Sequence, residues 1–252
     1  MTACRQGLPS EFSRSVEEAI LSRRSVRAFL PDEVPHATIA RILEVAARAP
    51  SGSNIQPWRV IILTGRPLAA LTRELEALAL SGDPGEEVYA YYPTRWREPH
   101  LARRRKVGWD LYGALGIARG ETEKIVRQQA RNYLFFGAPV GLLFTIEQDL
   151  ERGSWLDYGM FLQNIMLAAR GFGLDTCPQA AFVKYHRIIA SHLDIPAGQM
   201  LVCGMALGHR DPDAPENQIA TERAGPADFA RFVPPAAELP GRAGPHRTCG
   251  EA

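Results

Sequence analysis

Several features that would mark common classes of protein are scarce or missing in this chain of 252 residues. It has only four cysteines, with no CxxC pair and no metal-ligand spacing, so the sequence predicts neither a metal site nor a disulfide framework. No apolar run approaches the roughly 20 residues that span a bilayer. The first residues also lack the apolar core of a secretory signal. We therefore expect a cytoplasmic protein with no membrane partner.

The motifs of several familiar enzyme classes are also absent. There is no GxGxxG after a predicted strand, no GxxxxGK[ST], no HExxH and no GxSxG, which argues against a Rossmann nicotinamide site, a P-loop, a zinc protease and a serine hydrolase. The six histidines are scattered, and His186 and His192 are too far apart for a pair of ligands on one helix. The sequence therefore offers no obvious nucleophile or base, and we predict no catalytic side chain.

Charge of one sign is not in excess either. The formal net charge is +1, whereas a general nucleic-acid binder usually carries a clear basic surplus, so we expect no nucleic-acid partner. One run, Arg103–Lys106, is strongly basic. It fits a solvated helix face, and it also fits an electropositive mouth over a pocket that admits anionic ligands. A nucleic-acid-binding or regulatory module built on this run is a third hypothesis, and it would predict salt-dependent binding.

Hydrophobic periodicity predicts alternating helices and short buried strands in one domain, residues 12–233, between flexible ends at 1–11 and 234–252. A capping box at Ser15 and Glu18 predicts a first helix that ends at about Ser22 to Arg24. Residues 85–120 look less regular and unusually aromatic. Further helices are expected over 35–49, 68–80, 121–136, 155–170 and 184–193, and strands over 60–63, 140–146, 200–207 and from 174 to a break at Pro178.

Two polar stretches stand out against this background. Three arginines and a serine fall within Arg23–Arg27, at the end of the first predicted helix, and the loop Ser51–Asn54 has more donors than a turn requires. The arginines fit a helix C-cap, where cations oppose the exposed carbonyl dipole, or an anion site, because arginine binds phosphate through a charge-assisted fork. Anion contacts without an acid–base pair suggest that a cofactor carries the chemistry.

Four motifs give the chain a resemblance to the FMN-dependent nitroreductase family over about residues 12–232. Each motif is weak alone, and together they are specific. They are Arg23–Arg27 (RRSVR), Pro50–Trp58 (PSGSNIQPW), Gly173–Ala180 (GLDTCPQA), and Ala206–His209 (ALGH) with Thr221–Arg223 (TER). The resemblance implies an α+β fold with a central, mainly antiparallel sheet wrapped by helices. It also implies an intertwined homodimer with two FMN sites at the subunit interface.

The resemblance also implies a set of cofactor-binding residues. Arg23 and Ser25 match phosphate and ribityl contacts, and Arg24 would add backbone or ribityl contacts. Arg27 matches a cation near the pyrimidine edge of the flavin, where it would stabilise negative charge on the ring. The other implied contacts are Pro50, Ser51, Gly52 and Asn54 in a loop from the other subunit, Asn132, the strand end Pro178, Gln179 and Ala180, and the late phosphate-binding Arg223.

The implied activity is that of an FMN-dependent oxidoreductase. NAD(P)H would deliver hydride to flavin N5, and a nitroaromatic, quinone or similar small acceptor would then take it from the same position in a ping-pong mechanism. The alternative is a specialised flavin reaction on the same scaffold, such as reductive dehalogenation, ene reduction or breakdown of the flavin itself. Residues 96–120 would form the lid over the substrate, and the aromatic residues expected to contact substrate are Tyr92, Trp96, Trp109 and Tyr112.

Overall fold

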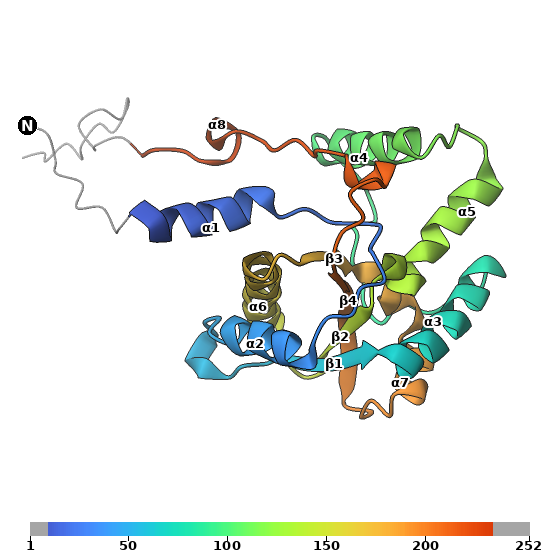
Figure 1. Ribbon diagram of the computed structural model, residues 1–252, viewed down its shortest axis with the longest axis horizontal. Helices are drawn as coiled ribbons and strands as arrows, with labels where there is room; N and C mark the ends of the chain where they lie inside the picture. The colour runs from blue at the N-terminus through green and yellow to red at the C-terminus, as the bar shows by residue number, and fades with distance from the viewer. Residues whose placement is uncertain (1–9, 234–252) are drawn as a thin grey trace, which may run out of the picture. The chain divides into compact units, whose positions relative to one another are not determined.

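A four-stranded antiparallel sheet lies at the centre of the computed structural model, which describes residues 10–233 (Figure 1). The strand order is β1-β2-β4-β3, and every neighbouring pair is antiparallel. The expected α+β class with an antiparallel sheet is therefore confirmed. The strands are β1 (Arg59–Thr64), β2 (Val140–Glu147), β3 (Asp175–Gln179) and β4 (Gln199–Gly208).

Helices cover both faces of this sheet. One core cluster joins the sheet to α2 and α6, and the other joins it to α3, α7 and the 3₁₀ turns η2 and η3. Strand β2 is buried from Val140 to Ile146, which explains why its sequence is a continuous apolar run and not an alternating one. The helices are α1 (Ser10–Ser22), α2 (His36–Ala46), α3 (Gly65–Leu80), α4 (His100–Ala114), α5 (Thr122–Ala130), α6 (Arg152–Gly171) and α7 (His186–His192), and the 3₁₀ turns are η1 (Gly52–Asn54), η2 (Arg131–Gly137), η3 (Ala180–Tyr185) and η4 (Pro215–Asn217).

The long helix α6 has two different faces. Tyr158, Phe161 and Ile165 follow helical spacing and are buried against the sheet and α2. On the other side, Leu156 is 71% exposed. The nearly all-apolar sequence of this helix therefore serves the core with one face and leaves Leu156 exposed on the other.

Two of the sequence-based predictions about helices are wrong. Helix α1 begins at Ser10, before the predicted cap Ser15, which therefore lies inside the helix. Residues 100–114, in the stretch that looked less regular, form α4, and the basic run Arg103–Lys106 is exposed on it, as a solvated helix face predicts. The predicted helix over 121–136 ends at Ala130 and tightens into η2, where Phe135 and Phe136 have φ of 48° and 56°. Both rings are buried, so core packing sets this backbone against the helical preference.

The predicted break at Pro178 is also wrong. Strand β3 continues through Pro178, which pairs with Met205, and ends at Gln179. Because β3 is the edge strand of the sheet, a residue without an N–H does not interrupt the ladder with β4.

Residues 220–233 belong to a second compact unit. It contains the short helix α8 (Pro226–Phe229), whose first turn is capped by Asp228, because its carboxylate accepts the N–H of Gly225 at 2.9 Å. The predicted end of the domain at residue 233 stays a prediction, and the stretches 1–9 and 234–252 lie outside the described residues. In the part of the chain that the structure describes, no helix is long and apolar enough to cross a membrane.

Candidate functional site

The arginine cluster lies beside the edge strand β3. After α1 ends at Ser22 the chain runs as an extended segment, in which Ser25 forms a parallel bridge with Thr176 and the N–H of Val26 donates to the carbonyl of Thr176 at 3.1 Å (Figure 1). Two of the four predicted segments, Arg23–Arg27 and the β3 strand end, are thus brought together.

The arginines of this cluster differ in exposure. Arg23 and Arg27 are half-buried, and Arg24 is exposed. Burial raises the pKa of the Cys177 thiol on β3 to about 11, and the charges of Arg27 and Arg23 oppose that rise. The Arg27 guanidinium donates to the carbonyl of Ser25 at 3.2 Å, which lies beyond the end of α1. Arg27 therefore does not cap the helix, and the charges of Arg27 and Arg23 act on the Cys177 thiol of β3.

The end of β3 carries buried polar atoms that lack a partner. Among the described residues, Thr176 Oγ1 and Gln179 Oε1 are buried without a hydrogen bond. The side-chain amide of Gln179 donates through Nε2 to the carbonyl of Asn132 at 2.7 Å, so Asn132, predicted to belong to the site, is placed next to this strand end. Buried oxygen acceptors are usually satisfied, so a bound molecule with donors would complete this wall.

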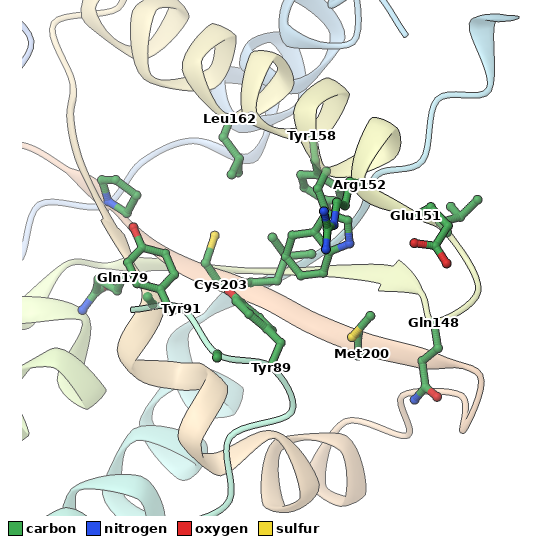
Figure 2. Close-up of a pocket in the computed structure, with 17 residues that line it drawn as sticks. Tyr89, Tyr91, Gln148, Glu151, Arg152, Tyr158, Leu162, Gln179, Met200 and Cys203 are labelled. Atoms are coloured by element: carbon green, nitrogen blue, oxygen red, sulfur yellow. Dashed lines mark hydrogen bonds between the residues drawn. The ribbon is translucent and has the colours of Figure 1, made fainter. Parts of the chain in front are cut away.

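A cavity of about 780 Å³ opens at the same strand end (Figure 2). Pro178, Gln179 and Ala180 line it together with apolar side chains of α6 and β4. Figure 2 shows Gln179 and Tyr91 at one end, with Glu151 and Gln148 at the other. The cavity is mostly apolar between these ends, as expected for a site that holds a flat organic molecule.

Two aromatic residues that the sequence analysis did not assign to the site form a wall of this cavity. The rings of Tyr89 and Trp155 meet edge to face with centroids 4.8 Å apart, and the Tyr89 hydroxyl donates to the carbonyl of Val202 at 2.5 Å. Burial raises the pKa of Tyr89, so its hydroxyl keeps its proton at neutral pH. The sequence signal for Tyr89 was the aromatic enrichment of residues 85–120, and Trp155 lies outside that stretch.

The predicted loop Pro50–Asn54 is anchored to α6. The N–H of Gly52 donates to Asp157 Oδ2 at 3.0 Å, and Asp157 is itself buried. Ser53 and Asn54 adopt positive φ of 50° and 58°, a strained conformation that the anchor helps to hold. None of the loop residues lines the cavity at β3. Asp157 was missed by sequence reasoning, although a single acid within the apolar stretch 155–170 was a usable signal.

The residues predicted to contact substrate are only partly brought together. Tyr92 and Trp96 lie 5.5 Å apart between ring centroids, and the Arg104 guanidinium sits 4.9 Å from the Trp96 ring. Trp109 is 70% exposed, and the hydroxyl of Tyr112 accepts a hydrogen bond from α5. None of the four residues lines the cavity, although Tyr91 connects it to Tyr92 through an edge-to-face contact at 4.7 Å.

Arg223 lies in the second unit. Its guanidinium donates to Thr221 Oγ1 at 2.7 Å and to the carbonyl of Glu222 at 2.9 Å. Its phosphate-binding role stays a prediction. Among the described residues there is no cluster of His, Cys, Asp and Glu that could hold a metal ion.

Fold and site together combine an arginine-rich segment beside a sheet edge, buried acceptors on the edge strand and a mostly apolar cavity, the features of a protein class that binds an organic molecule with an anionic group. A family model narrows this class, because the nitroreductase family model matches residues 20–209. The chain belongs to the nitroreductase family.

Curated relatives agree over most of the chain. A 4-nitrobenzoate reductase from Pseudomonas putida is 40% identical over 217 residues, which covers 86% of this chain and 95% of the relative. A nitrobenzene nitroreductase from Ectopseudomonas oleovorans is 40% identical over 221 residues, with 86% and 96% covered.

Solved structures share the fold as well. The FMN and NADPH-dependent nitroreductase NfnB from sphigopyxis sp. strain HMH has a TM-score of 0.84 at 36% identity and covers 87% of this chain and 99% of its own. The FMN-dependent NfnB from Mycobacterium smegmatis, solved in complex with NADPH, has a TM-score of 0.84 at 31% identity, with 88% and 100% covered.

Proposed function

We propose that this protein is an FMN-dependent oxidoreductase that uses NAD(P)H to reduce nitroaromatic compounds or similar small acceptors. The observation that carries the proposal is the pairing of the arginine-rich segment with β3 at Ser25 and Thr176, a strand that carries buried acceptors without a partner among the described residues. The activities of two relatives at 40% identity support the choice of acceptor, because these proteins are a 4-nitrobenzoate reductase and a nitrobenzene nitroreductase.

The chemistry of this wall fits FMN. A phosphate needs charge-assisted donors, and the half-buried Arg23 with Ser25 supplies them. A flavin also carries N–H and hydroxyl donors, which the unpaired Gln179 Oε1 and Thr176 Oγ1 can accept. When bound, FMN supplies the redox chemistry, since its N5 takes hydride from NAD(P)H and gives it to the acceptor.

The residues of the chain bind and orient, and none transfers a proton in this scheme. Arg23 and Ser25 hold the phosphate end, and Arg24 contributes from the exposed side of the same segment. Arg27 holds positive charge at the pyrimidine edge, where it favours electron-rich states of the ring. Pro178, Gln179 and Ala180 supply the wall against which the ring packs, and Asn132 fixes the Gln179 amide through its carbonyl.

We also propose that the site is completed by a second copy of this chain. The loop Pro50–Asn54 does not line the β3 cavity of its own chain, so it is free to serve the site of a partner. Apolar side chains on packed helices α1 and α6 are uncovered: Ile20 is 50% exposed, Leu21 74% and Leu156 71%. Exposed apolar side chains of this kind are typical of surfaces that a partner covers.

The test is a comparison of acceptors with purified protein, added FMN and either nicotinamide donor. Nitroarenes and quinones should be reduced much faster than by free FMN under the same conditions. Initial rates at several donor and acceptor concentrations should give the parallel reciprocal plots of a ping-pong mechanism. Reduction of nitroarenes and quinones no faster than by free FMN would overturn the assignment, and turnover of only halophenols or enones would favour the specialised alternative.

A further inference from the structure

A buried asparagine far along the sequence holds the backbone of the arginine cluster. Asn217, at the end of η4, is 7% exposed. Its Oδ1 accepts the N–H of Arg27 at 2.8 Å, and its Nδ2 donates to the carbonyl of Ala28 at 2.8 Å and to that of Asp211 at 2.8 Å. The oxygen faces a donor and the nitrogen faces two acceptors, so only one orientation of the amide satisfies all three bonds.

The Asn217 side chain holds the extended segment at Arg27 itself. On either side of Arg27, the extended segment is held by bonds between backbone groups: Val26 N–H to Thr176 at 3.1 Å and Leu30 N–H to His209 at 2.9 Å. At Arg27 itself, the backbone N–H is held by the Asn217 side chain. The amide therefore fixes the one backbone unit that sets the direction of the Arg27 side chain.

The turn that carries Asn217 is itself anchored to the other side of the wall. The neighbouring Glu216 is buried and forms an ion pair with Arg131, at the start of η2. The next residue, Asn132, accepts the Gln179 amide through its carbonyl at 2.7 Å. Two adjacent residues of η4 thus connect the arginine cluster with the Gln179 end of β3, so both walls of the site share one support.

We propose that Asn217 is a positioning residue of the flavin site, which holds the Arg27 guanidinium at the place where it acts on the bound ring. This inference rests on the proposed function, because it assigns the effect of Asn217 to the flavin. Asn217 touches no reacting atom in this scheme and acts through Arg27. Its loss should therefore change the electronic environment of the flavin, beyond any loss of stability.

The experiment is a double-mutant cycle with Asn217→Ala and Arg27→Ala, measured on the full chain with FMN bound. The readouts are the FMN dissociation constant, the midpoint potential of the bound flavin and the thermal unfolding temperature. Asn217→Ala should lower the potential in the same direction as Arg27→Ala, and weaken FMN binding by roughly tenfold, the scale of a lost buried hydrogen-bond group. In the Arg27→Ala background, Asn217→Ala should leave the potential nearly unchanged.

A matched control separates positioning from stability. Thr72 on α3 is also buried, and its hydroxyl donates to the carbonyl of Leu68 at 2.9 Å, remote in sequence from every predicted site segment. Thr72→Ala should lower the unfolding temperature and leave the potential unchanged. Asn217→Ser, which is uncharged and leaves a hydroxyl in the turn, replaces the alanine variant if that variant does not fold.

The outcomes distinguish the inference from the function it rests on. If Arg27→Ala shifts the potential and the Asn217 variant lowers only the unfolding temperature, the positioning role is wrong and the proposed function stands. Equal shifts from Asn217→Ala with and without Arg27 would also overturn the role, because the effect would then not act through that arginine. A protein that binds no FMN would contradict both the positioning role of Asn217 and the proposed function.

Discussion

Replacement of Arg23 by alanine tests the phosphate end of the proposed site. Arg23 follows α1 and is half-buried, and its charge opposes the rise in the pKa of the Cys177 thiol on β3. Solvent and salt therefore screen an ion pair at Arg23 only partly. A hydrogen bond to a charged group contributes about 1.5–3 kcal/mol. Its loss should therefore weaken FMN binding by roughly ten- to 150-fold.

The assay is a titration of flavin-free protein with FMN, followed by quenching of flavin fluorescence at constant salt. Arg23→Lys should fall between wild type and Arg23→Ala, because lysine keeps the charge and loses the bidentate fork. Arg66→Ala is the control, since Arg66 on α3 is exposed and its removal changes the net charge by the same amount. Unchanged FMN affinity in Arg23→Ala, or an equal loss in Arg66→Ala, would refute the phosphate role.

Two predictions concern the scaffold. A methyl group added in Gly204→Ala would lie 2.4 Å from Phe182 Cδ2, and such overpacking costs about 1–3 kcal/mol, so the unfolding temperature should fall; an unchanged temperature would mean that the ring moves freely. His186 accepts the N–H of Leu201 through Nδ1 at 3.3 Å, and burial lowers its pKa. The neutral form is favoured in the folded state, so stability is present above the unfolded pKa and is lost as pH falls below about 6.5. Urea unfolding between pH 5 and 7.5 should show this slope, His186→Gln should flatten it, and the exposed His36→Gln should not.

Much of the sheet could be predicted because its central strands are continuous apolar runs. Strands β2 and β4 are buried, and the runs 140–146 and 200–207 match them within a residue or two. The predicted break at Pro178 was wrong because the effect of a proline depends on whether its strand is central or at the edge of the sheet. The local sequence does not reveal the position of a strand in the sheet. The turn at Phe135 and Phe136 was missed for a similar reason, since their helical pattern is overridden by core packing.

The candidate site could be predicted where its residues are close in sequence. The motif Arg23–Arg27 and the segment Pro178–Ala180 were both identified, and the structure places the first beside the strand that ends in the second. The role of Asn217 was not predicted, because its hydrogen bond to Arg27 spans 190 residues and a single asparagine in a loop carries no local signal. The cavity-lining Tyr89 and Trp155 were also not assigned to the site, because a cavity is made by several elements and its lining follows no periodicity.

The central claim is that this chain binds FMN at the β3 edge. The most direct measurement is the visible absorbance of the purified protein, followed by titration of the flavin-free form with FMN. We predict a yellow protein, or a flavin-free form that takes up one FMN per chain and loses this affinity in Arg23→Ala. A colourless protein that does not bind added FMN would contradict the proposed cofactor and the activity that depends on it.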